Sequence, residues 1–118
     1  MARDLVARVE AYHAQLNAYD PVQVSKFFSA DAEYHSPGVG VLVGRRAIIA
    51  AMSGYFAEYP DQVAVDDVME QVAPDRVRSE WRLAATSKTT GQQTLRSGVE
   101  TVTFDEDGLI RRVQVEDR

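Results

Sequence analysis

The sequence has 118 residues, the size of one typical domain, and its 45% share of hydrophobic residues is that of a globular protein. The formal net charge is −5 and the arginines are spread along the chain, so we expect no nucleic-acid partner. No apolar run reaches the roughly 20 residues that span a bilayer, and the start of the sequence is charged, so we expect no membrane partner and a cytoplasmic location. The absence of cysteine excludes disulfides and thiolate metal sites.

The spacing of apolar residues predicts three helices in the first half of the chain. The first helix, over about residues 3–19, has one apolar face made of Leu5, Val9, Tyr12, Leu16 and Tyr19. Asp20 and Pro21 are typical of an N-cap followed by the first helical residue, so a short second helix is predicted over residues 21–29. The third helix, over residues 44–59, opens at Gly44 and ends before Pro60.

The remaining segments have the pattern of strands and turns. Residues 32–36 and 41–43 are predicted as short strands joined by the turn Pro37-Gly38-Val39-Gly40. Four longer strands are predicted over residues 63–72, 77–86, 94–104 and 109–115. The acidic, glycine-containing segment 105–108 is typical of a hairpin turn between the last two.

This order of elements predicts an α+β protein. The three helices of the N-terminal half would pack on one face of a curved, mainly antiparallel sheet of about six strands, in a single domain over residues 1–118. Such a cone-shaped arrangement leaves a cavity between the helices and the sheet, where small ligands usually bind. We therefore expect an apolar small-molecule ligand.

Several segments together carry a resemblance to a known superfamily. These segments are Leu16–Asp20, Phe27–Tyr34, Ser36-Pro37, Gly44, Tyr55-Phe56 and Phe104–Ile110. They make the chain similar to nuclear transport factor two, ketosteroid isomerase and the SnoaL-type polyketide cyclases. The resemblance implies the cystatin-like α+β cone of that superfamily, which hosts enzymes, binding modules and association domains.

The resemblance to the isomerases also implies an oxyanion site made by Tyr12 and Glu100. Tyr12 stands five residues before Asn17, as does the helix-one tyrosine of those enzymes, and Glu100 matches the position of its acidic partner. A carboxyl group buried beside Val102 and Phe104 would favour its neutral form, which donates a hydrogen bond. The alternatives are that Tyr12 is a core residue and that Glu100 is a solvated strand residue.

The usual catalytic base of the isomerases is missing. Ser36 stands where those enzymes carry an aspartate before the proline that matches Pro37, and serine has no useful basicity near neutral pH. His35 and a bound water are the candidates for the base, although strand alternation places His35 on the face opposite Ser36. His13 is expected to point away from the apolar face of its helix, into solvent.

The other ligand contacts are expected along the walls of the predicted cavity. They are Tyr34, Ser36, Met52, Tyr55, Trp81, Leu83 and Val102. No dinucleotide or phosphate-binding motif is present, and the spacing of the two histidines does not suit a metal, so we expect no cofactor and no metal.

These features favour a cofactor-independent isomerase or cyclase acting on an apolar carbonyl compound. The alternative is a non-catalytic ligand-binding or dimerisation domain of the same fold. A hydrolase of the limonene-epoxide type ranks last, because no convincing Asp-Arg-Asp set is visible in the pocket strands. The resemblance also implies a homodimer through the outer sheet face, which would carry Arg78, Glu80, Arg82, Val99, Thr101 and Thr103.

Overall fold

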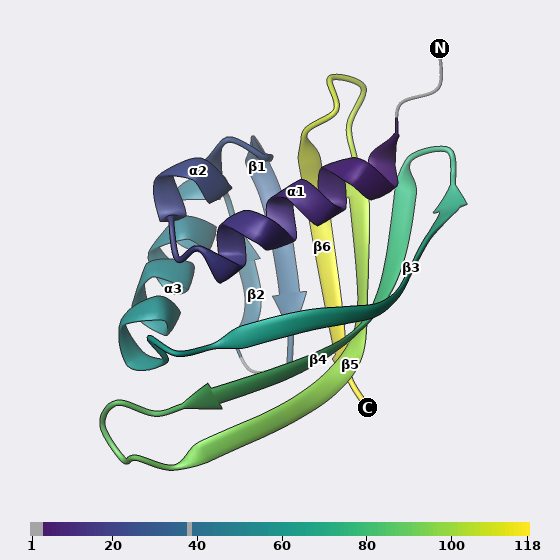
Figure 1. The fold of residues 1–118 in the computed structure, drawn as a ribbon. Coiled ribbons are helices and arrows are strands. Elements are labelled where there is room, and N and C mark those ends of the chain that lie inside the picture. Colours follow the sequence, from purple (N-terminus) through teal and green to yellow (C-terminus); the bar gives the residue numbers. More distant parts are fainter. Residues whose placement is uncertain (1–3, 38) are drawn as a thin grey trace.

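A computed structural model of the chain describes residues 4–37 and 39–118 (Figure 1). Within these ranges the chain forms α1 (Leu5–Asn17), α2 (Pro21–Ser25), β1 (Phe28–Ser36), β2 (Gly40–Val43), α3 (Arg45–Glu58), β3 (Val63–Ala73), β4 (Arg76–Thr86), β5 (Gln93–Phe104) and β6 (Ile110–Asp117). Residue 3, which the sequence analysis includes in the first helix, and Gly38 of the predicted turn lie outside the described residues.

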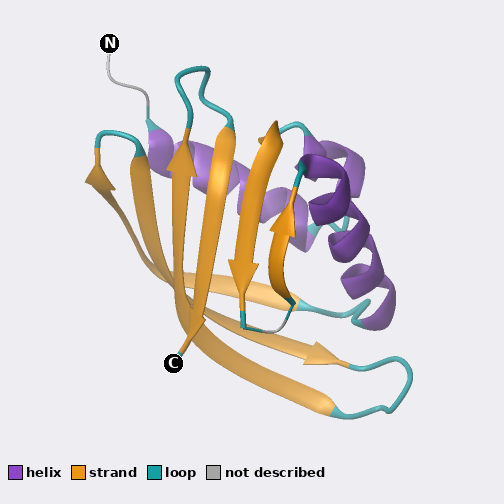
Figure 2. Ribbon diagram, turned by 180° about the vertical axis from the view of Figure 1, so that it is seen from behind, coloured by secondary structure: helices purple, strands orange, loops and turns teal. Residues whose placement is uncertain are grey.

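The strands form one sheet in the order β2-β1-β6-β5-β4-β3. Strands β3 to β6 pair antiparallel with their sequence neighbours, and β1 pairs antiparallel with β2 but parallel with β6. The helices lie on one face of the curved sheet, and the view from behind shows strands without helices over them (Figure 2). The predicted class, three helices on a mainly antiparallel curved sheet, is confirmed. None of the helices in the described part of the chain is long and apolar enough to cross a membrane.

Local signals in the sequence account for where the helices begin. The Asp20 side chain accepts a hydrogen bond from the Gln23 N–H at 3.1 Å, with Pro21 in the first helical turn, as predicted. At the start of α3, Gly44 has φ of 95° and donates its N–H to the Ala32 carbonyl at 2.7 Å. This left-handed conformation favours glycine, so Gly44 both opens the helix and ties it to β1.

The second helix is shorter than predicted. Helix α2 ends at Ser25, and the predicted helical residue Phe28 instead begins β1, where it pairs with Ile110 of β6. Phe28 is fully buried, and so is Ala32 further along β1. Pairing with a strand more than 80 residues away in the sequence therefore overrides the local helical pattern.

The sheet is closely packed at Gly98 of β5. A Cβ atom on Gly98 would lie 2.0 Å from the carbonyl oxygen of Glu116 on β6 and 2.8 Å from Cζ2 of Trp81 on β4. Only glycine allows the backbone of β5 to approach its neighbours this closely. Gly98 lies between Arg96 and Glu100 on the inner face of β5, so its contacts help to set where these two side chains lie.

Side-chain hydrogen bonds attach β3 to the end of α1. The Asn17 amide donates to the Ala64 carbonyl and accepts from the Ala64 N–H, both at 3.0 Å. The Gln62 amide donates to the Leu16 carbonyl at 3.2 Å, and the Tyr19 hydroxyl donates to the Gln62 carbonyl. These contacts hold the inner face of β3 against α1, where Asp66 and His13 meet.

Candidate functional site

A cavity of about 410 Å³ lies between the helices and the inner face of the sheet, a size suited to a small organic ligand. Six of the predicted ligand-binding residues line it: Tyr34, Ser36, Met52, Tyr55, Trp81 and Leu83. They come from β1, α3 and β4, which are brought together only in the folded chain. Apart from its charged side chains, the wall is mainly aliphatic and aromatic.

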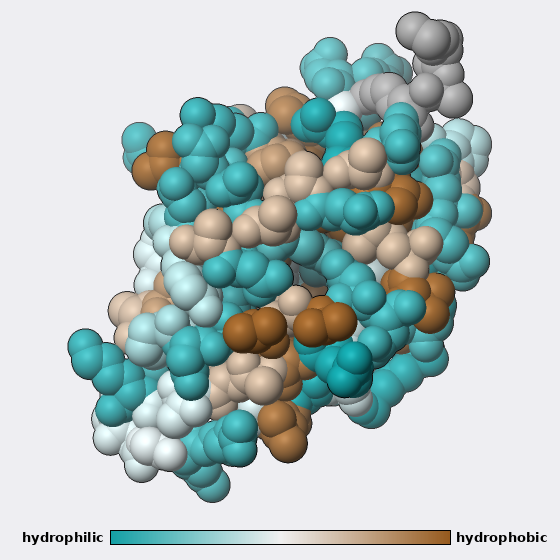
Figure 3. All heavy atoms as spheres, viewed as in Figure 1, coloured by the Kyte–Doolittle hydropathy of each residue, from teal (hydrophilic) through white to brown (hydrophobic). Residues whose placement is uncertain are grey.

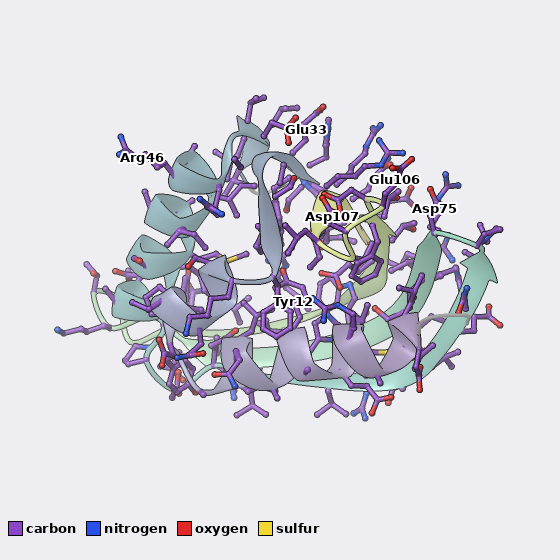
Figure 4. The ribbon with its side chains drawn as sticks, turned by 90° about the horizontal axis from the view of Figure 1, so that it is seen from above. Tyr12, Glu33, Arg46, Asp75, Glu106 and Asp107 are labelled. Carbon is purple, nitrogen blue, oxygen red and sulfur yellow. The ribbon has the colours of Figure 1, made fainter. Side chains whose placement is uncertain are left out.

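Val102 and Tyr12 are not part of the cavity wall. Val102 belongs to the packed core, and Tyr12, which points from α1 into the interior in Figure 4, is also fully buried there. The Tyr12 hydroxyl has no hydrogen-bond partner among the described residues, and burial together with the charge of Glu100 raises its pKa well above the ordinary value. The structure therefore gives Tyr12 a core position and brings only Glu100 of the predicted oxyanion pair to the cavity.

His35 also lies outside the cavity wall. Its Nε2 is 3.0 Å from Oε1 of Glu33, two residues earlier on the same strand face. Tyr34 and Ser36, its neighbours in β1, point to the cavity, so strand alternation places the His35 side chain on the opposite face. The structure shows no bulge that would turn this side chain inward at His35, since the register of β1 with β2 is regular from Glu33 to Ser36.

The prediction that His13 points into solvent is wrong. Its Nδ1 lies 2.7 Å from Oδ2 of Asp66 on β3, and its Nε2 lies 2.6 Å from Oε1 of Glu100 on β5. Only 13% of the His13 side chain and 8% of the Glu100 side chain are exposed. All three side chains line the cavity, so α1, β3 and β5 together build a carboxylate–imidazole–carboxylate cluster.

Two neighbouring carboxylates control the protonation of His13. Burial lowers its pKa by removing water from the charged ring, but the negative charge of Glu100 and the hydrogen bonds with Asp66 and Glu100 outweigh it. The net effect raises the pKa of His13 from 6.5 to about 10. At neutral pH the ring is therefore an imidazolium whose two N–H groups donate to the two carboxylates.

The position of His13 on the helix carries a local signal of its inward orientation. His13 follows Val9 by four residues and precedes Leu16 by three, so it lies at the edge of the apolar face of α1 rather than opposite it. Its partners lie 53 and 87 residues away in the sequence. No local pattern identifies Asp66 or Glu100 as these partners.

Arg96 forms a second charged point on the cavity wall. Its guanidinium carbon lies 5.5 Å from the centre of the Trp81 ring, and its Nη2 donates to Oδ1 of Asp117 at 2.7 Å.

Burial raises the pKa of Tyr34 far above the ordinary value and Glu100 raises it further, whereas the positive charge of Arg96 acts in the opposite direction. Burial also raises the pKa of Tyr55, again opposed by Arg96. The charges of Glu100 and Arg96 therefore act on the Tyr34 hydroxyl in opposite directions.

The cavity wall contains two acids and an arginine, the residue types of the acid–arginine–acid set that was not recognised in the sequence. Asp66, Arg96 and Glu100 all line it, but His13, and not the arginine, bridges the two carboxylates. In residues 4–37 and 39–118, no group of three or more histidine and acidic side chains is arranged to hold a metal ion. The chemistry that the cluster offers by itself is proton transfer.

A family model for the SnoaL-like domain matches residues 9–113. A search of curated proteins found no match. The family match begins at Val9 and ends at Val113 of β6, so it spans the cluster and all of the cavity wall except Val115.

Solved structures with this fold are similar over nearly the whole chain at low sequence identity. AclR, a putative hydroxylase from Streptomyces galilaeus, has 20% identity and a TM-score of 0.82, with 100% of this chain and 91% of that chain covered. SalBIII, an epoxide hydrolase/cyclase-like enzyme of pyran ring formation in the polyether salinomycin, has 16% identity and a TM-score of 0.82 over 93% and 87% of the two chains. A protein with a ketosteroid isomerase-like fold from Catenulispora acidiphila has 17% identity and a TM-score of 0.82 over 98% and 86%. At these identities the similarity establishes the fold alone.

Proposed function

Since the chain belongs to the SnoaL-like domain family, we propose that it is a cofactor-independent enzyme that transfers protons on an apolar carbonyl compound, by isomerisation or cyclisation. The observation that supports this proposal is the cluster of Asp66, His13 and Glu100 on the wall of a mainly apolar cavity. It supplies a carboxylate base and a proton donor at one point, which the sequence alone did not offer. It replaces the Tyr12–Glu100 oxyanion pair as the proposed machinery.

In the proposed step, Glu100 is the base. Its Oε1 accepts a hydrogen bond from His13, which leaves Oε2 to take a proton from the carbon next to the substrate carbonyl. The C–H electron pair forms the double bond of an enolate, and the negative charge moves to the substrate oxygen. In a β,γ-unsaturated substrate the enolate is conjugated, and return of the proton from Glu100 to the γ-carbon re-forms the carbonyl and completes an isomerisation. In a cyclisation the enolate carbon attacks a second carbonyl of the substrate and forms the new C–C bond, and Glu100 returns its proton to the resulting alkoxide.

The developing negative charge needs hydrogen-bond donors on the cavity wall. Tyr34 and Tyr55 both carry hydroxyl groups there, and the imidazolium of His13 adds a positive charge beside Glu100. Because the surroundings are mainly apolar, such donors stabilise an enolate more strongly than water would. Raised pKa values keep both tyrosines protonated at neutral pH, so they remain donors.

Deuterium exchange tests this proposal without knowledge of the natural substrate. A set of apolar ketones is incubated with the protein in heavy water, and exchange at the carbon next to the carbonyl is followed by NMR. We expect exchange above the uncatalysed rate, reduced at least about 100-fold by Glu100→Gln. His35→Gln, which removes a histidine outside the cavity, serves as the matched control and keeps the rate. Equal exchange with wild type and Glu100→Gln would contradict the assignment of the base.

The alternative is a non-catalytic ligand-binding domain. It is favoured by the serine at position 36 and by the fact that both ring nitrogens of His13 are already hydrogen-bonded within the cluster. In that case the ketones would bind, as measured by the fluorescence of Trp81 in the cavity wall, but no exchange would occur.

A second candidate activity is the opening of an epoxide. Asp66 and Glu100 flank a protonated imidazole, so one part of the cluster can activate a nucleophile while another protonates the leaving oxygen. The similarity to SalBIII adds to this candidate at the level of fold. Turnover of apolar epoxides, with no exchange on ketones, would favour it over the first proposal.

We also propose a homodimer through the outer sheet face. Val99 and Thr103, expected in that interface, are only 6% and 5% exposed within the single chain, so they contribute little contact area. More apolar contact area is offered by the exposed residues Val63, Val65 and Val68 of β3. Hydrophobic patches follow the path of this strand in Figure 3. Light scattering at micromolar concentration measures the mass, and a monomer would contradict the proposal.

A further inference from the structure

The two charged regions of the cavity differ in sign and in exposure. The Glu100 side chain is 8% exposed and the Arg96 side chain is 30% exposed, although both lie on the inner face of β5. Glu100 and His13 therefore form the more buried end of the cavity, and Arg96 lies nearer to solvent. Arg96 has no role in the proton transfer proposed above.

The spacing along β5 sets the distance between these regions. Arg96 and Glu100 are four residues apart on one strand face, which corresponds to about 13 Å in a straight strand and less in a curved one. A bound molecule of moderate length can therefore reach the cluster with one end while its other end lies beside Arg96.

Several contacts shape the region around Arg96 for a negatively charged group. The Trp81 ring packs against the guanidinium. Asp117 accepts a hydrogen bond from Nη2, and this bond does not use the other N–H groups of the guanidinium. Tyr55 lies in the same wall, close enough for the charge of Arg96 to affect its hydroxyl. Arginine beside an aromatic ring and a hydroxyl donor is suited to a carboxylate.

We propose that the cavity binds an apolar carboxylic acid, with its carboxylate on Arg96 and its reacting carbonyl at Glu100. This inference rests on the proposed function and adds the substrate class and its orientation. Asp66 and Glu100 repel an anion from the buried end, so the orientation is fixed by charge. Apart from His13, Arg96 is the one cationic side chain in the described cavity wall, which suits a monoanion better than a phosphate dianion.

The test compares two probes of the same shape. Phenylhexanoate carries the anionic group, and its neutral counterpart is the methyl ketone in which a methyl group takes the place of one carboxylate oxygen. Binding is followed by the fluorescence of Trp81, the single tryptophan of the chain. We expect the carboxylate to bind at least about tenfold more tightly than the ketone, with a preference that weakens at high salt.

Two substitutions should shift this preference in opposite directions. Arg96→Met keeps an apolar stem and removes the charge, so it should abolish the preference for the carboxylate over the ketone. Asp117→Asn removes the competing carboxylate, so it should tighten binding of phenylhexanoate by a few-fold. Arg82→Met, on the outer face of the sheet and bonded to Asp67, is the control and should change neither affinity.

The outcomes separate this inference from the proposed function. If both probes bind with equal affinity to the wild-type protein, the cavity binds apolar ligands and the carboxylate site is refuted. A preference that survives Arg96→Met, with Asp117→Asn also without effect, would overturn the assignment to Arg96. If neither probe binds, the ligand-binding cavity itself is contradicted, and this inference fails with it.

Discussion

Both histidines of the chain lie beside carboxylates, but the two sites are built differently. His35 contacts Glu33, two residues away on the same strand, and the Glu33 side chain is 48% exposed. His13 lies between Asp66 and Glu100, which belong to two other strands, and its side chain is 13% exposed. The first site is a local surface pair, and the second exists only when α1, β3 and β5 are assembled.

This difference determines what each site can do. A surface pair exchanges its partner readily for water, so it contributes little to stability and has no fixed geometry. The cluster around His13 is held by the fold on three sides and keeps a proton on the imidazole at neutral pH.

The cluster depends on the close packing of β5 at Gly98. Gly98→Ala places a Cβ atom against the Glu116 carbonyl and the Trp81 ring, so we expect a loss of at least about 3 kcal/mol of unfolding free energy. Urea denaturation measures this change in unfolding free energy. Gly54→Ala, on an open face of α3, is the matched control and should be neutral or stabilising by up to about 1 kcal/mol. Equal effects of the two substitutions would contradict the packing described for β5.

The two histidines should differ in their contribution to stability. His13→Gln leaves Asp66 and Glu100 close together without the cation between them, and we expect a loss of about 2–3 kcal/mol, less than for a fully buried pair because Asp66 is partly exposed. His35→Gln should stay within about 0.5 kcal/mol of wild type. If the two variants unfold at the same urea concentration, the cluster is no more than a surface pair.

The raised pKa of His13 predicts a pH dependence of stability. The folded-state pKa of about 10 lies above the unfolded value of 6.5, so the contribution of His13 is complete below about pH 6.5 and is lost as the pH rises through about 10. Wild type and His35→Gln should therefore lose stability over this range, and His13→Gln should lose less. NMR titration of the His13 ring checks the pKa directly, and a midpoint near 6.5 would refute the cluster.

The smallest effect is expected at Tyr12. Its hydroxyl has no hydrogen-bond partner in the described part of the chain, so Tyr12→Phe should leave the unfolding free energy within about 0.5 kcal/mol of wild type and leave ketone exchange unchanged. Tyr19→Phe, which removes a hydroxyl that donates to the Gln62 carbonyl, should cost about 1 kcal/mol. A large loss of exchange in Tyr12→Phe alone would restore the tyrosine to the oxyanion site that the sequence predicted.

The sequence by itself determined the elements whose signals are local. The cap at Asp20-Pro21, the opening of α3 at Gly44 and the turn at residues 105–108 depend on residues within one helical turn or one hairpin, and each is found where it was predicted. Strand alternation likewise placed Trp81 and Leu83 on the inner face of β4, where they line the cavity.

Only the tertiary structure decided the features that join distant segments. Residues from Phe28 onward form a strand because β6 lies beside them, and Tyr12 is enclosed in the core because its aromatic neighbours Phe27 and Phe28 pack around it. His13 became part of a charged cluster because the fold brought two carboxylates to it from 53 and 87 residues away. A helical periodicity tells which side of a helix is apolar, but the partners of a residue at the edge of that side depend on which strands pack against it.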